Sequence, residues 1–311
     1  MLHTVYPKDF LGLLGLGIHQ GANIAAPYSE LNSQTSRNFG WEVLSSLVTQ
    51  KNRNMVSILV TNGLENSGFI VVKKAAQSST WEIKLLLVEG TDTEVLSRTI
   101  SDAINASIKN NGRRILFRIG SQSGIAKKMA TFGFKSYSTE SFYSLSANLR
   151  NINFGPKPDG TSFIYRNKEN KDDYPLFTLY NKKLPREVRL GEGITFDHWV
   201  ETINSQWADA DSIKDIIITK DDVLQTWIRS ASFSKNTSLV KLMLPLPADV
   251  QFNPFNFQQF STETLISLPD HCNISHRQME SWGYKYSGAY INLFREFGKT
   301  VPEGAFATAS L

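Results

Sequence analysis

The stretch MATFGFKSYSTESFYSL, residues 129–145, has a close counterpart in MESWGYKYSGAYINLF, residues 279–294. Both begin Met-x-x-aromatic-Gly-aromatic-Lys, and both continue with polar residues that alternate with aromatic or aliphatic ones. A glycine in the left-handed conformation commonly ends a helix, and an alternation of period two indicates a strand. Each copy therefore predicts the end of a helix followed by a strand, with Gly133 and Gly283 as the equivalent helix ends.

The separation of 150 residues between the copies (279 − 129) indicates that the chain contains two similar halves. The chain has 311 residues, which is long for one hydrophobic core and sufficient for two. Residues 150–173, RNINFGPKPDGTSFIYRNKENKDD, are mostly polar and contain two prolines and two glycines, as is typical of a linker. We therefore predict an N-terminal domain at 1–149, a linker at 150–173 and a more divergent C-terminal domain at 174–311.

The same order of elements is predicted in both halves: two helices, three strands, a helix, a strand, a short helix and a final strand. The strands are predicted from β-branched and aromatic residues between turns, and they cover 56–63, 67–75, 80–90, 113–120, 134–145, 215–221, 224–234, 238–246, 264–271 and 284–294. The predicted helices cover 10–18, 38–48, 91–112, 123–133, 174–180, 195–203, 250–260 and 274–283.

The helix predicted between Thr93 and Asn111 has the clearest periodicity. Apolar residues recur every four positions and predict one face buried against a sheet; they are Leu96, Ile100, Ile104 and Ile108. Thr91 or Thr93 is predicted to cap the start of this helix, and Gly112 is predicted to end it.

The order β–α–β–α–β after three antiparallel strands, with a Gly-aromatic pair after the last helix, resembles the GNAT superfamily of N-acetyltransferases. The resemblance runs from about Val56 to Leu149 in the first half and from about Tyr174 to Phe297 in the second. It implies an α/β fold with a mixed sheet, built from two tandem GNAT-like domains that pack about a pseudo-two-fold axis. In this family, acyl-CoA sits in a V-shaped gap between two neighbouring strands. The resemblance therefore implies acetyl-CoA or another acyl-CoA as the cofactor, and no metal.

In this family, backbone N–H groups of a glycine-containing loop and of the following helix hold the pyrophosphate. Glycine lets the backbone come close, and the helix dipole favours an anion. The corresponding loop of this chain is EGTDTE, residues 89–94. From the resemblance we assign cofactor binding to Val88, Gly90, Thr91, Thr93, Gln122, Lys127 and Lys128.

The acidic residues of the same loop leave a second interpretation open. Glu89, Asp92 and Glu94 place negative charge where phosphates would bind, and acidic residues at a helix start are also ordinary capping residues. The loop then only stabilises the start of the helix, without a ligand. The corresponding loop of the second half contains Pro245 and Pro247, which lack N–H donors.

The family's downstream pattern places a tyrosine four residues before the glycine, where it protonates the departing thiolate of CoA. Met129 and Met279 occupy that position here, and a thioether cannot donate a proton. The position of the family's asparagine holds Gln122 in the first half and Cys272 in the second. No catalytic residue is therefore assigned, although an amine placed correctly against a thioester can react mainly through its position.

The single cysteine, Cys272, excludes an intrachain disulfide. With His271 and His276 it suggests a metal site or a Cys-His nucleophile, but the sequence offers no clear further ligand. We favour a buried thiol beside a surface histidine. The phenylalanine-rich stretch 252–260 is either an aromatic surface for a partner or an acyl chain, or a core segment, which we favour.

Charge and hydropathy restrict the classes of partner. The chain has 33 Lys and Arg against 29 Asp and Glu, a net charge of +4, which is low for a nucleic-acid-binding protein. The basic residues around Lys127 and Lys128, namely Arg113, Arg114 and Arg118, are an anion site or, as we favour, a solvated face. The apolar run at 10–18 is too short to span a bilayer and favours a core helix over a signal peptide.

We therefore expect a cytoplasmic protein with no nucleic-acid or membrane partner. Its small-molecule substrate or protein partner cannot be read from the sequence. Two functions stay open. One is acyl-CoA-dependent transfer to an amine, and the other is a non-catalytic protein, a pseudoenzyme of GNAT fold, that binds a small molecule or a protein.

Overall fold

The protein is described from a computed structural model, which describes residues 24–26, 28, 55–62, 65–75, 79–88, 93–145, 163–233, 237–246 and 263–297. The strands are β1 (Met55–Asn62), β2 (Glu65–Lys74), β3 (Thr80–Val88), β4 (Arg114–Gly120), β5 (Lys135–Leu145), β6 (Phe163–Asn167), β7 (Ser212–Lys220), β8 (Val223–Phe233), β9 (Thr237–Leu242), β10 (Glu263–Pro269) and β11 (Tyr284–Glu296). The helices are α3 (Thr93–Lys109), α4 (Asp173–Lys183), α5 (Arg186–Glu192), α6 (Phe196–Gln206) and α7 (His276–Ser281), with 3₁₀ turns η5 (Ala126–Phe132), η7 (Asn170–Asp172) and η9 (Asp270–Cys272).

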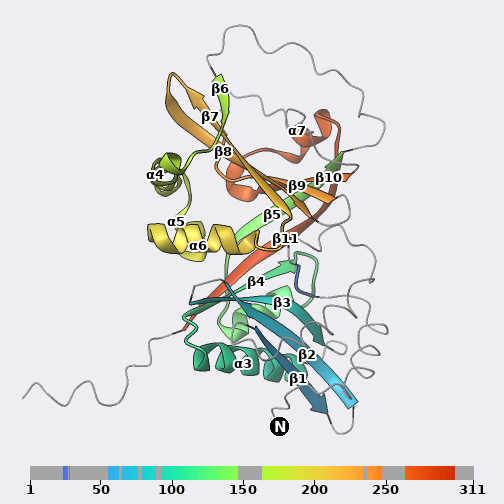
Figure 1. The fold of residues 1–311 in the computed structure, drawn as a ribbon. Helices are drawn as coiled ribbons and strands as arrows, with labels where there is room; N and C mark the ends of the chain where they lie inside the picture. Colours follow the sequence, from blue (N-terminus) through green and yellow to red (C-terminus); the bar gives the residue numbers. More distant parts are fainter. Residues whose placement is uncertain are drawn as a thin grey trace, which may run out of the picture.

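All eleven strands belong to one mixed sheet, in the order β1-β2-β3-β4-β11-β5-β10-β9-β8-β7-β6 (Figure 1). The last strand of each half lies inside the sheet of the other half. β11 pairs antiparallel with β4, and β5 pairs antiparallel with β10. The two halves therefore exchange their final strands: each half of the sheet contains the last strand of the other half of the chain.

A pseudo-two-fold axis passes between the exchanged strands β5 and β11. Glu140 on β5 is paired with Tyr290 on β11, and these positions differ by the repeat length of 150 residues (290 − 140). Gly133 and Gly283 end the short helices before these strands, with φ of 76° and 83°. The repeat predicted from the sequence is confirmed: both glycines adopt the left-handed conformation that favours glycine.

Alternation along β4 separates the two faces of the first half of the sheet. Ile115, Phe117 and Ile119 belong to the hydrophobic core that contains α3 and Met129 of η5. Leu116 faces the other way and packs with Tyr137 and Leu190 of α5. In Figure 1, α3 lies on one side of β1 and β2, whereas α4, α5 and α6 lie beside the second half of the sheet.

Strand predictions in both halves are confirmed, and the helix predicted at 91–112 is α3. One position on its inner face was predicted wrongly. Ile104 and its predecessors are buried, but Ile108 is 37% exposed because it lies in the last turn of the helix. The helix ends at Lys109, shortly before Gly112, and the left-handed residue in the turn that follows is Asn111, with φ of 60°.

Other predictions on secondary structure are corrected or stay untested. The segment before Gly133 is a 3₁₀ helix, η5, rather than an α-helix. Residues 163–173 of the predicted linker form β6, η7 and the first residue of α4. The helices predicted at 10–18, 38–48 and 250–260 lie outside the described residues, and the division into domains stays a prediction.

Candidate functional site

The strands β3 and β4 part shortly after they begin. They pair in parallel at only three positions, from Thr80 with Arg114 to Glu82 with Leu116. Just beyond, the pairing of β3 with β2 shifts, because Lys84 is an extra residue between Ile83 and Leu85. A bulge of this kind bends a strand and increases its twist. The bulge at Lys84 thus lies beside a gap between β3 and β4. The gap begins after the last paired residues and lies toward the end of β3 from which the chain continues to α3.

A short segment from near the N-terminus lies in this gap. The N–H of Ile24 donates to the carbonyl of Leu86 on β3 at 2.9 Å, and the N–H of Ala26 donates to the carbonyl of Arg118 on β4 at 3.0 Å. Ala25 forms an antiparallel bridge with Ile119 and is 3% exposed. The segment 24–26 therefore bonds to both parted strands.

Among the described residues predicted to hold the cofactor, the structure brings Thr93 and Lys128 into contact. Val88 is buried at the end of β3. The ammonium of Lys128, on η5, donates to the hydroxyl of Thr93, the first residue of α3, at 2.9 Å. Gln122 and Lys127 are exposed on the turn and helix after β4. Gly90 and Thr91 lie outside the described residues.

The second half has no such gap in its described part. β9 and β10 pair in parallel at five positions, from Thr237 with Glu263 to Lys241 with Ser267. The pairing of β9 with β8 shows no shift of register. Of the predicted second loop, Pro245 is described and residues 247–249 are not. The described strands of the second half therefore stay closed where those of the first half part.

The methionines in the position of the family's tyrosine have no exposure. Met129 and Met279 are each 0% exposed and belong to the cores on either side of the pseudo-two-fold axis. They fill space in the core. Neither position supplies a proton donor to the gap.

Cys272, His271 and His276, which were predicted as a possible Cys-His group, each make separate contacts in the structure. Cys272 is a buried free thiol, and burial raises the pKa of this thiol. His276 is exposed, and its Nδ1 lies 2.6 Å from the hydroxyl of Tyr143. His271 approaches Asp270, with Nδ1 3.7 Å from Oδ1. Among the described residues, no group of three or more metal-ligating side chains is present.

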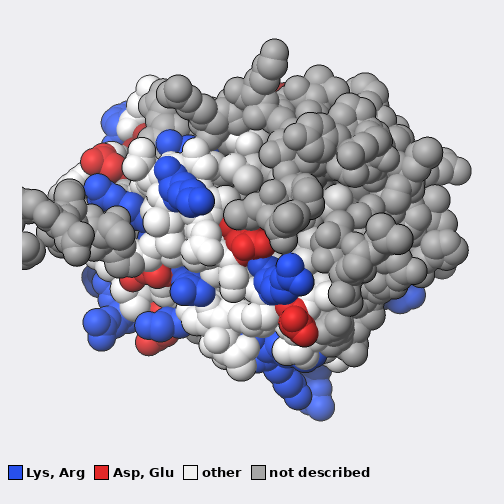
Figure 2. Space-filling view, turned by 90° about the horizontal axis from the view of Figure 1, so that it is seen from below, with Lys and Arg blue, Asp and Glu red and all other residues white. Residues whose placement is uncertain are grey.

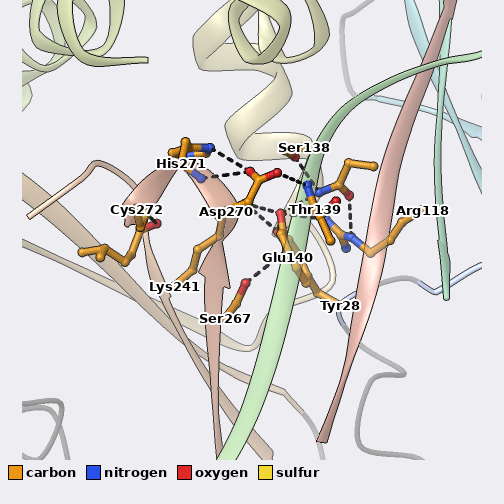
Figure 3. A network of polar contacts seen from close by, with 12 residues as sticks. Tyr28, Arg118, Ser138, Thr139, Glu140, Lys241, Ser267, Asp270, His271 and Cys272 are labelled. Atoms are coloured by element: carbon orange, nitrogen blue, oxygen red, sulfur yellow. Dashed lines mark hydrogen bonds and ion pairs between the residues drawn. The ribbon is translucent and has the colours of Figure 1, made fainter. Parts of the chain in front are cut away.

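A buried polar network lies where the two halves meet (Figure 3). Its centre is the carboxylate of Glu140 on β5, which is 1% exposed. Lys241 of the second half donates to Oε1 at 2.7 Å, and Tyr28 donates to Oε2 at 2.9 Å. Asn292 of β11 and Ser267 of β10 complete the shell at 2.9 and 3.1 Å.

The side chain of Arg118 connects this network to the gap. Its guanidinium lies 3.6 Å from the centre of the Tyr28 ring, and Nη2 lies 3.8 Å from Glu140 Oε1. Its backbone carbonyl is the one that accepts from Ala26. Arg118 therefore contacts both the inserted segment and the carboxylate at the junction of the halves.

Burial and charge act in opposite directions on this network. Burial alone would raise the pKa of Glu140, but Lys241 and Arg118, with hydrogen bonds from Lys241 and Tyr28, lower it to about 2. Burial raises the pKa of Tyr28 to about 12, so this phenol stays protonated at neutral pH. Glu140 is thus an ionised structural group with its lone pairs occupied, and it is unsuited to accept a proton from a substrate.

These contacts correct the interpretation of the basic residues near Lys127. Arg113 is exposed, as a solvated face requires, but Arg114 and Arg118 are each only 7% exposed. Arg114 donates to the hydroxyl of Thr202 and to the carbonyl of Gly191. Both buried arginines therefore make internal contacts. Arg114 joins β4 to the second half, and Arg118 joins β4 to Glu140.

A second charged group lies at the closed end of the gap. Lys84, the bulged residue, forms ion pairs with Glu82 at 3.0 Å and with Asp209 at 3.5 Å. Burial would lower the pKa of Lys84, but Glu82 and Asp209 raise it. Glu82 is the last residue of β3 that pairs with β4, and its side chain is 14% exposed. The backbone of Glu82 therefore lies at the apex of the gap, and its carboxylate is paired with the ammonium of Lys84.

No pattern in the sequence indicates these roles for Tyr28, Glu82, Glu140 or Lys241. A lone charged residue inside an alternating strand looks like a solvent-facing position unless the strand order is known.

Figure 2 shows the face of the first half seen from below, where Lys and Arg lie interspersed with Asp and Glu. In the described part of that face, no continuous basic surface forms. No described helix is long and apolar enough to cross a membrane.

No protein-family model matches the chain, and no curated protein matches it in sequence. Solved structures do match. A GCN5-related N-acetyltransferase from Sphaerobacter thermophilus superposes with a TM-score of 0.54 at 10% identity, over 95% of this chain and 95% of that one. A GCN5-related N-acetyltransferase from Kribbella flavida gives 0.46 at 11% identity, over 83% and 95%. A tandem GNAT protein from the clavulanic acid biosynthesis pathway gives 0.48 at 10% identity, over 96% and 98%.

The first of these matches extends over nearly the whole chain and both halves. With the repeat about β5 and β11, it shows that the chain has a tandem GNAT fold. At 10% identity, the likeness concerns the fold alone.

Proposed function

We propose that this tandem GNAT-fold protein binds acyl-CoA in the gap between β3 and β4 and transfers the acyl group to an amine. One observation carries the proposal. The first half keeps a bulged β3 that parts from β4 after three paired positions, whereas the second half pairs β9 with β10 at five. Between strands that part in this way, the backbone groups that face the gap can bond to an extended segment or ligand instead of to the neighbouring strand.

The residues around the gap suit parts of acyl-CoA. The pantetheine arm carries two amides, so it can bond to the backbone of β3 near Leu86 and Val88 as a peptide strand would. Lys128 and the N–H groups at the start of α3 supply positive charge for a phosphate, with Glu94 as an opposing charge. Acyl-CoA supplies the activated acyl group as a thioester.

Glu82 is the residue we assign as proton acceptor. The amine nitrogen attacks the thioester carbonyl, the C–S bond breaks, and the amine loses a proton. We propose that the carboxylate of Glu82, whose backbone lies at the apex of the gap and which is paired with Lys84, takes that proton directly or through one water. With buried methionines in both tyrosine positions, the departing thiolate takes its proton from solvent.

Isothermal calorimetry and a thiol-release assay test this proposal. We expect one acetyl-CoA per chain, and at 100 times Kd a stabilisation of about 2.7 kcal/mol. Glu82→Gln is expected to keep that affinity within a few fold and to slow acyl transfer by about 10²- to 10⁴-fold. Glu187→Gln, at an exposed position on α5, is the matched control and should change neither quantity. Absence of acetyl-CoA binding at millimolar ligand would contradict the proposal.

The methionines at both tyrosine positions favour a second candidate function. A chain without that proton donor can bind acyl-CoA and report its concentration without turnover. The two functions differ in one measurement. Acetyl-CoA binding with no thiol release, in the presence of varied primary amines, would support the binding protein over the transferase.

A further inference from the structure

We infer that residues 24–26 are a built-in competitor of acyl-CoA, which closes the gap until the segment is displaced. The inference rests on the proposed function, because it concerns the same gap. It adds that the unliganded protein is self-occluded, and that ligand binding must be coupled to the release of this segment.

The hydrogen bonds of the segment carry the inference. An extended ligand that enters between β3 and β4 needs the backbone groups that face the gap. Ile24 already occupies the carbonyl of Leu86 at 2.9 Å, and Ala26 occupies the carbonyl of Arg118 at 3.0 Å. Both acceptors lie beyond the last paired position of their strands, Glu82 and Leu116. The segment and a pantetheine arm therefore compete for the same edge of β3.

The packing of the segment shows that it closes the gap rather than lying across its mouth. Ala25 is 3% exposed and belongs to the core that contains Ile119 and Val88. Ile24 is partly buried and packs against the same core. A ligand that enters this space must remove the small side chain of Ala25 from apolar surroundings.

Displacement of the segment would also disturb contacts at the junction of the two halves. Tyr28 follows the segment by only two residues, and its hydroxyl donates to Glu140. Its ring stacks on Trp207 of the second half, with centroids 4.9 Å apart. Tyr28 thus anchors the segment from one side, and its contacts hold the closed state through residues of both halves.

The free energy needed to displace the segment determines how much a variant should change the Kd for acetyl-CoA. If the closed form dominates, the apparent Kd equals the intrinsic Kd divided by the small fraction of open molecules. A backbone hydrogen bond contributes about 0.5–1.5 kcal/mol net, which at 1.4 kcal/mol per factor of ten equals about 2- to 12-fold. Ile24→Pro removes the N–H that bonds to Leu86, and it should lower the Kd for acetyl-CoA by about that factor.

Ala75→Pro is the matched control. It removes one backbone hydrogen bond, from Ala75 to the carbonyl of Thr80 at 2.9 Å, in the connection between β2 and β3. This bond lies at the opposite end of β3 from Leu86, so the affinity should stay within about 2-fold of that of the parent protein.

Amide hydrogen exchange in the parent protein gives a second measurement that needs no substitution. A ligand ordinarily slows exchange near its site. Here, acetyl-CoA should accelerate exchange at Ile24 and Ala26, because it takes over their acceptors, while the amide of Ala75 stays unchanged.

The outcomes separate the two proposals. Tighter binding by Ile24→Pro, with accelerated exchange in the parent, supports both. Acetyl-CoA binding with unchanged affinity in Ile24→Pro, and with unchanged or slower exchange at Ile24 and Ala26, overturns the competition and leaves the proposed function standing. No binding by either protein at millimolar acetyl-CoA removes the proposed function, and the competition with it.

Discussion

The substitution Glu140→Gln tests whether the buried network holds the two halves together. The change keeps the shape of the side chain and removes its charge. Lys241 and Arg118 would then stay buried, at 2% and 7% exposure, without their counter-ion. The new amide NH₂ would also face a shell that consists largely of donors, including Asn292 and Tyr28.

The pKa of Glu140 gives the size of the effect. The network lowers this pKa from 4.5 to about 2, a difference of about 2.5 (4.5 − 2). At 1.36 kcal/mol per pKa unit, the difference corresponds to ~3 kcal/mol of stability at neutral pH. Loss of one partner from a buried ion pair typically costs about 3–5 kcal/mol, which agrees. We therefore expect Glu140→Gln to lose at least ~3 kcal/mol of unfolding free energy.

The pH dependence follows from the same shift and supplies a second signature. Because the folded pKa is the lower one, the contribution is complete above the unfolded pKa near 4.5 and is lost as the pH falls toward about 2. The parent protein should lose stability across that interval. In Glu140→Gln this component should be absent, so the two stability curves should converge at low pH.

Urea denaturation, followed by tryptophan fluorescence between about pH 2 and pH 7, measures both quantities. Glu187→Gln, on the exposed side of α5, should stay within about 0.5 kcal/mol of the parent. In Glu140→Gln/Lys241→Met, which removes both charges, part of the loss should be recovered. A loss below 1 kcal/mol in Glu140→Gln at pH 7, or parallel pH curves for it and the parent, would refute the assignment of Glu140 as the central counter-ion.

Two further predictions concern the helix α3 and the repeated glycines. Ile104→Asp places a charge in the interface between α3 and the sheet, where Ile104 is 5% exposed, and should cost several kcal/mol in the same urea assay; a variant as stable as the parent would contradict the buried face. Gly133→Ala forces a residue with a Cβ to φ 76° and should cost about 1 kcal/mol, whereas Gly124→Ala, with open space around it, should be nearly neutral. Equal costs for the two would show that the left-handed conformation is not what requires Gly133.

The sequence was sufficient for the local parts of the fold. The repeat, the strands and the helix ends at Gly133 and Gly283 follow from patterns within about ten residues, and the structure confirms them. Burial of Met129 and Met279 follows from the same patterns. Such features depend on the periodicity and conformational preference of neighbouring residues, which a single sequence contains.

The exchange of β5 and β11 could not be predicted in that way. Both strands have a similar alternation of polar and apolar residues, so either one could pair with β4 or with β10. The order of elements along the chain does not say which of these two strands each one joins. The network around Glu140 depends on that exchange. It joins residues separated by 112 positions, as in Tyr28 with Glu140, and by 101 positions, as in Lys241 with Glu140. The resemblance placed the candidate site between two neighbouring strands, but Glu82 was missed for the same reason, since it gains its place from the parting of β3 and β4.

The two halves differ by one extra residue in β3, Lys84, as an alignment of the paired strands shows. Leu116 pairs with Phe294, and Leu265 pairs with Ser144. Because Phe294 and Ser144 differ by the repeat length of 150 (294 − 144), the two leucines are equivalent. On the neighbouring strands they pair with Glu82 and Leu239.

The next paired residues, Ile83 and Val240, are equivalent too, but after them the pairing continues with Leu85 in the first half and with Lys241 in the second. Leu85 is therefore equivalent to Lys241, and Lys84 has no counterpart in the second half. Lys84 is the extra residue of the bulge, so β3 turns away from β4 and a gap opens beside it. Lys241 stays in register with Ser267, and Glu140 holds its ammonium at 2.7 Å. A bulge beside Lys241 would break that buried ion pair, whereas Lys84 keeps its partners in a less buried place. The strand exchange that brings Glu140 to Lys241 thus holds β9 against β10 in the second half, which agrees with our proposal that a ligand enters in the first half.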